Sequence, residues 1–147
     1  MLIVSTAAAA VTQPAAPAAS VGTLKVERHG NQGRPVILVP GLQGGSWVWQ
    51  RTIEQLQQNH VVYAVTLAGF DGVPAPAGNG SLLDRADASL LQLVQQIKAH
   101  DKSGKPVLVG HSLGGTLSLR FVGEHPELVA GVVAVDGLPV FPGMERL

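Results

Sequence analysis

The residues best suited to chemistry in this sequence form the segment Gly110-His111-Ser112-Leu113-Gly114. The segment has the pattern G-x-S-x-G, in which a serine on a sharp turn between a strand and a helix acts as a nucleophile. Such a turn forces the backbone of Ser112 into a strained conformation and lifts its hydroxyl above the sheet edge. Gly110 and Gly114 are required because a side chain at either position would collide with a neighbouring strand or helix.

The sequence on both sides of Ser112 distinguishes a catalytic serine from a strand-to-helix turn in which small residues have only a structural role. The apolar run Val107–Val109 comes before the motif, and a helical stripe of apolar residues comes after it. A helix that begins at this point directs its free amides and positive dipole toward any anion that forms beside Ser112. This context favours nucleophilic catalysis over a purely structural turn.

Short apolar runs alternate with helical patterns from residue 23 onward. The alternating pattern of Leu24–Arg28 predicts an edge strand. Four continuous apolar runs predict strands that are buried on both faces, over Val36–Val39, His60–Val65, Pro106–Val109 and Val129–Val135. Buried strands that alternate with helices predict right-handed βαβ units and a mostly parallel sheet. Without further strands beside it, the last of these strands would expose apolar surface.

Three helical patterns connect the strands. The expected helices cover Trp47–Gln58 with Ser46 as N-cap, the stretch from the Ser81–Asp84 capping box to about His100, and the stretch from the serine motif to His125-Pro126. Trp47 is expected to pack in the core beneath its helix, and the alternative is that it lines an apolar pocket with Leu42 and the loop 66–80. There is no internal repeat, and the pattern from 23 to 147 predicts one domain.

Residues 1–22 differ in composition from the rest of the chain. They are rich in Ala and Pro, and no Lys or Arg occurs before Lys25. This segment is similar to the apolar core and small-residue end of a signal peptide, although the basic leader is missing. A signal-like segment predicts a secreted or periplasmic protein, whereas a disordered tail predicts a cytoplasmic one.

The overall composition excludes several classes of function. Ten basic and ten acidic residues give a formal net charge of zero, which argues against a nucleic-acid partner. The chain has no cysteine, no metal-ligand spacing, no dinucleotide fingerprint and no phosphate loop, so we expect neither metal nor cofactor. No apolar run reaches the roughly 20 residues of a transmembrane helix. The oligomeric state stays open.

Four segments together resemble the α/β-hydrolase superfamily of esterases, lipases and related enzymes. They are Val39–Leu42, Leu67–Phe70, Val109–Gly115, and His125–Glu127 with the following Val133–Gly137. The resemblance covers residues 24 to 140 and corresponds to the N-terminal portion of that fold. It implies an α/β fold with a mostly parallel twisted sheet and helices on both faces, truncated after the strand that follows the nucleophile helix.

The resemblance also implies an oxyanion hole beside Ser112. One donor would be the backbone amide of Leu113, and the other would be the amide of Leu42, in the loop after the first buried strand. The family's common His-Gly pair is replaced by Pro40-Gly41, which changes a side chain and leaves the donor amide. The amides of residues 43 to 45 are alternatives to Leu42. Two such donors are worth about 3–4 kcal/mol each.

The histidine base of this superfamily follows the last strand, and none of the five histidines is placed there. His111 is interpreted as a packing residue beside the serine and His125 as a helix-end residue. The other three are expected to be solvated: His29, His60 and His100. We therefore expect this piece to be an inactive fragment.

The acid of the triad is open as well. Asp136 directly follows the fourth buried strand, where a minority of the family's lipases carry the triad acid, and a structural loop role is the alternative. Asp71 is interpreted as a turn former beside Gly72.

The predicted function is a serine hydrolase that transfers the acyl group of a small or medium uncharged ester, or of an amide, to water. Ser112 would be its nucleophile. Two alternatives remain. The first is a non-catalytic binding module with a hydrolase-like fold, and the second is a related acyltransferase or haloperoxidase on the same fold.

Overall fold

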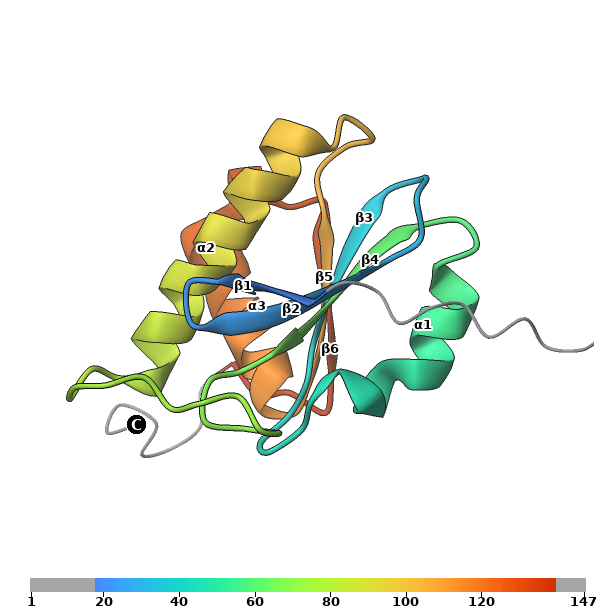
Figure 1. The fold of residues 1–147 in the computed structure, drawn as a ribbon. Helices are drawn as coiled ribbons and strands as arrows, with labels where there is room; N and C mark the ends of the chain where they lie inside the picture. The colour runs from blue at the N-terminus through green and yellow to red at the C-terminus, as the bar shows by residue number, and fades with distance from the viewer. Residues whose placement is uncertain (1–17, 140–147) are drawn as a thin grey trace, which may run out of the picture.

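A computed structural model describes residues 18–139, which form one six-stranded sheet covered by helices (Figure 1). The strands are β1 (Ala18–Val21), β2 (Leu24–His29), β3 (Pro35–Val39), β4 (Val61–Thr66), β5 (Val107–His111) and β6 (Gly131–Val135). The helices are η1 (Ser46–Trp49), α1 (Gln50–Leu56), α2 (Leu82–His100), α3 (Leu113–Glu124) and η2 (Pro126–Leu128). Of the predicted signal-like segment 1–22, residues 1–17 lie outside the described residues.

The sheet is parallel through its centre and antiparallel at the β1 end. Its strand order is β1-β2-β4-β3-β5-β6, in which β3 pairs in parallel with β4 and β5, and β5 pairs in parallel with β6. The carboxyl ends of β3, β5 and β6 therefore lie next to one another at one edge of the sheet. This arrangement confirms the predicted α/β fold class.

Strand β2 is an interior strand, so the prediction of an edge strand at Leu24–Arg28 is wrong. It pairs antiparallel with β4 on one side and with β1 on the other. Strand β1 comes from residues 18–21, which the composition had assigned to the segment before the domain. Val21 is buried, so the packed domain extends to include β1.

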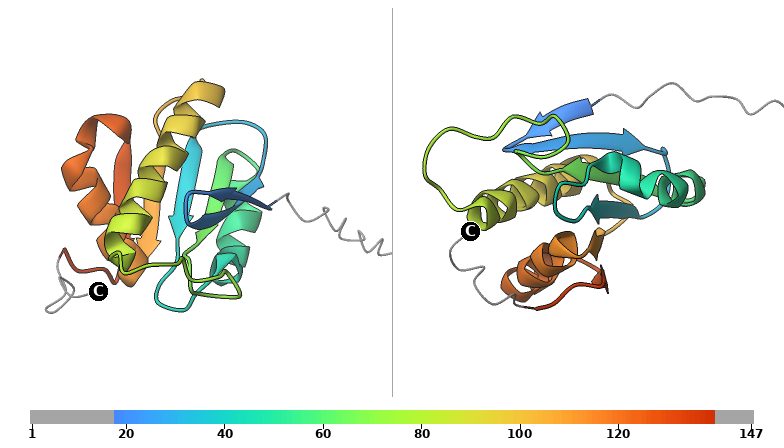
Figure 2. Two further views of the ribbon diagram at one scale, coloured as in Figure 1. Left: turned by 60° about the vertical axis from the view of Figure 1, so that its left-hand side comes forward. Right: turned by 90° about the horizontal axis from the view of Figure 1, so that it is seen from below.

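The helices cover both faces of the sheet, as predicted (Figure 2). Helices α2 and α3 share one hydrophobic core with the side chains of Ile37, Val39 and Val65. On the opposite face, Trp49 and Ile53 from η1 and α1 pack on side chains of β3 and β4. Alternate residues of β3 thus face different helical layers, which explains why its apolar run is continuous.

The first helical segment differs from its prediction at the amino end. The predicted helix Trp47–Gln58 is a 3-10 turn followed by the short helix α1, and the N-cap of the turn is Gly45 without a side-chain hydrogen bond. Ser46 is the first residue of that turn, so the prediction of Ser46 as N-cap is wrong. Trp47 is 63% exposed, so its predicted packing in the core is wrong as well.

Helix α2 begins as predicted, because the amide of Asp84 donates to the Ser81 hydroxyl over 3.4 Å. It ends at His100, also as predicted. Among the described residues, no helix is both long and apolar enough to cross a bilayer.

Strand β6 is exposed, although its sequence predicted burial on both faces. Val133 is 50% exposed and Val135 is 46% exposed. The reason is positional: β6 is last in the strand order, and α3 packs against the sheet on one face only. The apolar surface expected at the last strand is therefore confirmed for the described part of the chain.

Candidate active site

Ser112 occupies a single strained turn between β5 and α3. Its φ is 52° and its ψ is −118°, a left-handed conformation that is rare for residues with a side chain. The turn is held by two backbone hydrogen bonds, from the Ser112 amide to the Val135 carbonyl (2.9 Å) and from the Thr116 amide to the Ser112 carbonyl (3.1 Å). The strained conformation predicted for Ser112 is therefore present, and neighbouring elements hold it in place.

The glycines on either side of Ser112 permit this close packing. A Cβ on Gly110 would collide with the carbonyl of Gly114, in the first turn of α3. A Cβ on Gly114 would collide with the carbonyls of Val39 and Pro40, where β3 ends. The sequence-based reason for both glycines is confirmed, since α3 can meet β3 and β5 only without side chains there.

The loop after β3 lies directly beside Ser112. Parallel pairing of Val39 with Gly110 brings the ends of β3 and β5 together. A Cβ built on Gly41 would lie 3.3 Å from the Ser112 Cβ and 3.2 Å from Nδ1 of His111. The loop then turns through a hydrogen bond from the Gly44 amide to the Gly41 carbonyl (3.1 Å). We call residues 41–46 the site loop.

Two backbone amides near Ser112 are available for a ligand. Leu113 is the first residue of α3, so its amide has no partner within the helix. Leu42 is in the site loop, and its side chain is exposed. Within residues 18–139, no hydrogen bond engages either amide. The positive end of the α3 dipole lies at the same place, so this position favours negative charge.

Asp136 follows β6 at the same edge of the sheet. Val135 pairs with His111, so Asp136 is one residue beyond the register of that pair. Its φ is 53° and it is exposed. The chain then returns to α3, where the Thr116 hydroxyl donates to the Leu138 carbonyl over 2.6 Å. The fold therefore brings Asp136 and Ser112 to adjacent strand ends.

The five histidines divide between the two edges of the sheet. His111 is the last residue of β5, at the same edge of the sheet as Ser112, and its ring lies against Gly41. His125 follows α3 and stacks on Phe121 with ring centroids 5.0 Å apart. The remaining three lie at the amino edge of the parallel strands: His29, His60 and His100.

The prediction that these three are solvated holds for His100 alone. His29 and His60 are half-buried, and each has one ring nitrogen that is buried without a hydrogen-bond partner among the described residues. A depression at the same edge is lined by residues that include Arg28, Tyr63 and Lys102. It contains none of the predicted site residues and is separate from Ser112.

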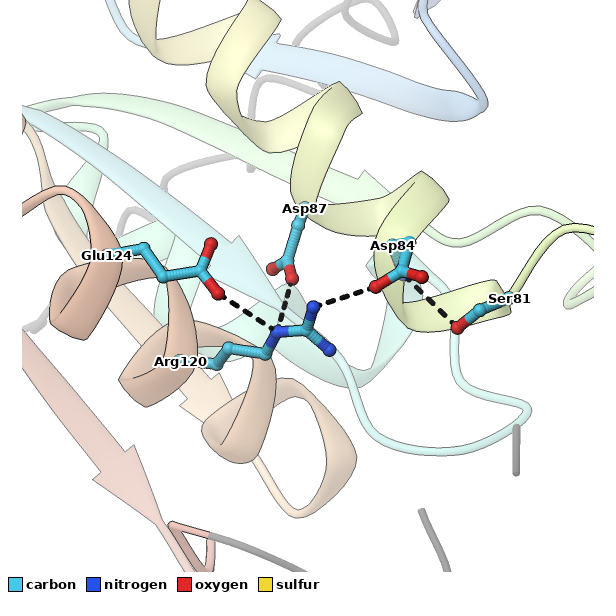
Figure 3. A network of polar contacts seen from close by, with 5 residues as sticks. All are labelled: Ser81, Asp84, Asp87, Arg120 and Glu124. Atoms are coloured by element: carbon cyan, nitrogen blue, oxygen red, sulfur yellow. Dashed lines mark hydrogen bonds and ion pairs between the residues drawn. The ribbon is translucent and has the colours of Figure 1, made fainter. Parts of the chain in front are cut away.

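An ion cluster joins α2 to α3 on the face of the sheet that they cover (Figure 3). Arg120 lies 2.7 Å from carboxylate oxygens of both Asp84 and Asp87, and 3.5 Å from Glu124. Burial raises the pKa of Asp87 to about 6, although Arg120 opposes the rise. The capping-box pattern indicated a role for Asp84, but nothing in the sequence indicated that Arg120 and Asp87 lie close together.

The last residue of β4 and a residue of the loop after it contact the site loop; the sequence did not indicate the first, and it indicated the second only as a turn former. The Thr66 hydroxyl accepts a hydrogen bond from the Ser46 amide over 3.3 Å. The carboxylate of Asp71 lies against Gly45, where a Cβ would overlap it. Thr66 ends β4 at the carboxyl edge, and a polar residue in that position is the signal that could have found it.

Solved structures share this arrangement of sheet and helices. The monoacylglycerol lipase of Paleococcus ferrophilus is 30% identical with a TM-score of 0.67, over 78% of this chain and 43% of that one. The fold is thus that of the α/β hydrolases. A family model described as the alpha/beta hydrolase fold matches residues 34–147, and the chain belongs to this family.

Two curated relatives indicate the range of chemistry within the family. The triacylglycerol lipase of Burkholderia plantarii is 34% identical over 87% of this chain and 35% of its own length. The 1-acylglycerol-3-phosphate O-acyltransferase ABHD5 of Rattus norvegicus is 25% identical over 85% of this chain and 36% of its own length. The chain therefore spans about a third of the length of these relatives.

Proposed function

We propose that this protein is a serine hydrolase that transfers the acyl group of an ester or amide to water, with Ser112 as nucleophile. The observation that carries the proposal is the placement of Ser112. It has a φ of 52° at the start of α3 and lies beside a loop that ends a neighbouring parallel strand. Strained backbone conformations cluster at active sites, and this tendency supports a catalytic role for Ser112.

In the proposed reaction, the Ser112 hydroxyl attacks the carbonyl carbon of the substrate and its proton passes to a general base. The amides of Leu42 and Leu113 stabilise the oxyanion of the tetrahedral intermediate. Collapse of the intermediate expels the alcohol or amine with that proton, and water then releases the acyl group from Ser112. The base is a histidine from outside residues 18–139, and Asp136 is the candidate that orients it.

The surface beside Ser112 supports an uncharged, apolar acyl ester as substrate. Three apolar side chains on and just after the site loop are exposed: Leu42 by 66%, Trp47 by 63% and Val48 by 40%. Apolar groups at the mouth of a site favour apolar ligands. The triacylglycerol lipase among the relatives is named for an ester of this uncharged, apolar class.

The test uses the protein expressed from its complete gene, with a fluorophosphonate probe and a series of p-nitrophenyl esters. We expect the probe to label Ser112, and Ser112→Ala to abolish labelling and lower kcat by at least about a thousandfold. Ser103→Ala, at the opposite edge of the sheet, is the matched control and should retain full activity. Undiminished hydrolysis by Ser112→Ala would refute the proposal, and an unreactive Ser112 in the wild type would favour a binding module.

Transfer to an acceptor other than water is the second candidate, and the acyltransferase relative favours it. Product analysis with added alcohols separates the two. A hydrolase yields free acid throughout, whereas an acyltransferase yields the new ester at the expense of acid.

A further inference from the structure

The end of β4 and the loop that follows it contact the site loop at residues 45 and 46. Phe70 donates its amide to the Leu67 carbonyl over 3.2 Å, and the Gly69 amide donates to the Val73 carbonyl over 2.9 Å. The Val73 amide also donates to the Phe70 carbonyl over 2.9 Å. These bonds make residues 67–73 a compact, well-defined turn, so it can serve as a support for its neighbour.

Two side chains contact the site loop, one from the last residue of β4 and one from this turn. Thr66 is 1% exposed, and its hydroxyl accepts the Ser46 amide, which is otherwise a free amide at the start of a 3-10 turn. Asp71 has a φ of 45°, and its carboxylate lies close to the α-carbon of Gly45. A Cβ on Gly45 would lie only 2.9 Å from the Asp71 Cβ and closer still to its carboxylate.

The site loop is therefore fixed at both ends. Gly41 lies against Ser112 and His111 at one end, while Gly45 and Ser46 contact Asp71 and Thr66 at the other. The hydrogen bond from Gly44 to Gly41 links the two ends across the turn. Because of this link, we expect a displacement of residues 45–46 to shift the Leu42 amide relative to Ser112.

We propose that Thr66 and Asp71 are positioning residues that set the distance between the Leu42 amide and Ser112, through the Ser46 amide and the α-carbon of Gly45. This inference rests on the proposed function, because it assigns a purpose to the Leu42 amide. Neither side chain touches the reacting atoms. Both act by limiting where the site loop can lie, and a misplacement of about 1 Å at such a site costs about a hundredfold in rate.

The decisive test is a reciprocal pair of substitutions in the protein expressed from its complete gene. Gly45→Ala drives a methyl group into Asp71, so kcat for ester hydrolysis should fall by about a hundredfold while KM stays unchanged. Asp71→Gly removes the obstacle and suits the left-handed backbone, so alone it should lower kcat by about three- to tenfold. The double variant should recover to the level of Asp71→Gly.

Thr66 is tested by a conservative series. Thr66→Val removes the acceptor at nearly constant volume and should lower kcat by about three- to tenfold, whereas Thr66→Ser should restore it. Fluorophosphonate labelling of Ser112 should slow by the same factors. Two matched controls should label at the wild-type rate: Gly123→Ala, whose added methyl meets nothing within 4 Å beyond its own stretch of helix, and Thr52→Val, on the helix α1.

The outcomes separate this inference from the proposed function. If the wild type is active through Ser112 but Thr66→Val and Asp71→Gly turn over at its rate, the positioning role is overturned while the hydrolase assignment stands. Failure of Asp71→Gly to rescue Gly45→Ala overturns it as well. A wild type without activity that depends on Ser112 refutes the proposed function, and the positioning role falls with it.

Discussion

Replacement of Asp87 by Asn should make the stability of this protein less sensitive to pH. The Asp87 side chain is only 11% exposed, between α2 and α3. Its Oδ2 lies 2.7 Å from Nε of Arg120, yet neither carboxylate oxygen receives a well-directed hydrogen bond from the described residues. Burial raises the pKa of Asp87 by more than the attraction to Arg120 lowers it. Repulsion from Glu124 and Asp84 raises this pKa further, and His125 lowers it. The net result is a rise from 3.8 to about 6.

The sign and size of the effect follow from this pKa. The folded state holds the proton on Asp87 more tightly than the unfolded state does, so Asp87 contributes stability below about pH 4. That contribution is lost as the pH rises through about 6. The difference between 3.8 and about 6 corresponds to about 3 kcal/mol. Asn carries no charge at any pH, so the stability of Asp87→Asn should not fall in this way as the pH rises.

The assay is urea unfolding of the wild type and Asp87→Asn between pH 4 and pH 8. The two free energies of unfolding should be similar at pH 4, and the variant should become more stable by up to about 3 kcal/mol at pH 7.5. Asp84→Asn, which removes a 68% exposed partner of the same arginine, controls for the loss of a contact with Arg120. A difference between wild type and Asp87→Asn that is constant with pH, or that favours the wild type at pH 7.5, would refute the reasoning.

Four further substitutions test the packing around the site by thermal or urea unfolding. Arg120→Met leaves Asp87 without its cation and should cost about 1–3 kcal/mol at pH 7.5. Phe121→Ala removes a fully buried ring from the core under α3 and should cost about 3–5 kcal/mol. Gly114→Ala forces a methyl group into the end of β3 and should cost at least about 1–3 kcal/mol. Gly123→Ala should instead stabilise α3 by about 0.5–1 kcal/mol, because its added methyl meets open space; a destabilised Gly123→Ala would contradict the described packing.

Local patterns were sufficient for most of the central fold. The continuous run of β3 predicted a strand covered on both faces, and its residues do contact helices on opposite sides. The turn at Ser112 could be predicted from Gly110 and Gly114, because the backbone packs so closely at these two positions that only glycine fits. Ser81 and Asp84 likewise fixed the start of α2, because a capping box is a local signal.

Long-range contacts account for what the sequence did not predict. The burial expected for β6 depends on elements beside it, and Val133 is exposed because the described part of the chain covers only one of its faces. Strand β1 was missed because Ala18–Val21 has a composition typical of a tail and becomes ordered by pairing with β2. The contact between Asp71 and Gly45 joins two loops that are far apart in sequence, and no local pattern encodes it.

The pairing of β3 has a consequence for biosynthesis. Val36 pairs with Val62 on one side and with Val107 on the other, so this central strand lacks its second neighbour until β5 has left the ribosome. Until then, a fully apolar segment has one open side and no complete helical layer above it, and such nascent species are prone to aggregate. Slow translation between β4 and β5 would therefore lower the yield of native protein, and a chaperone that shields Pro35–Val39 during that interval would raise it.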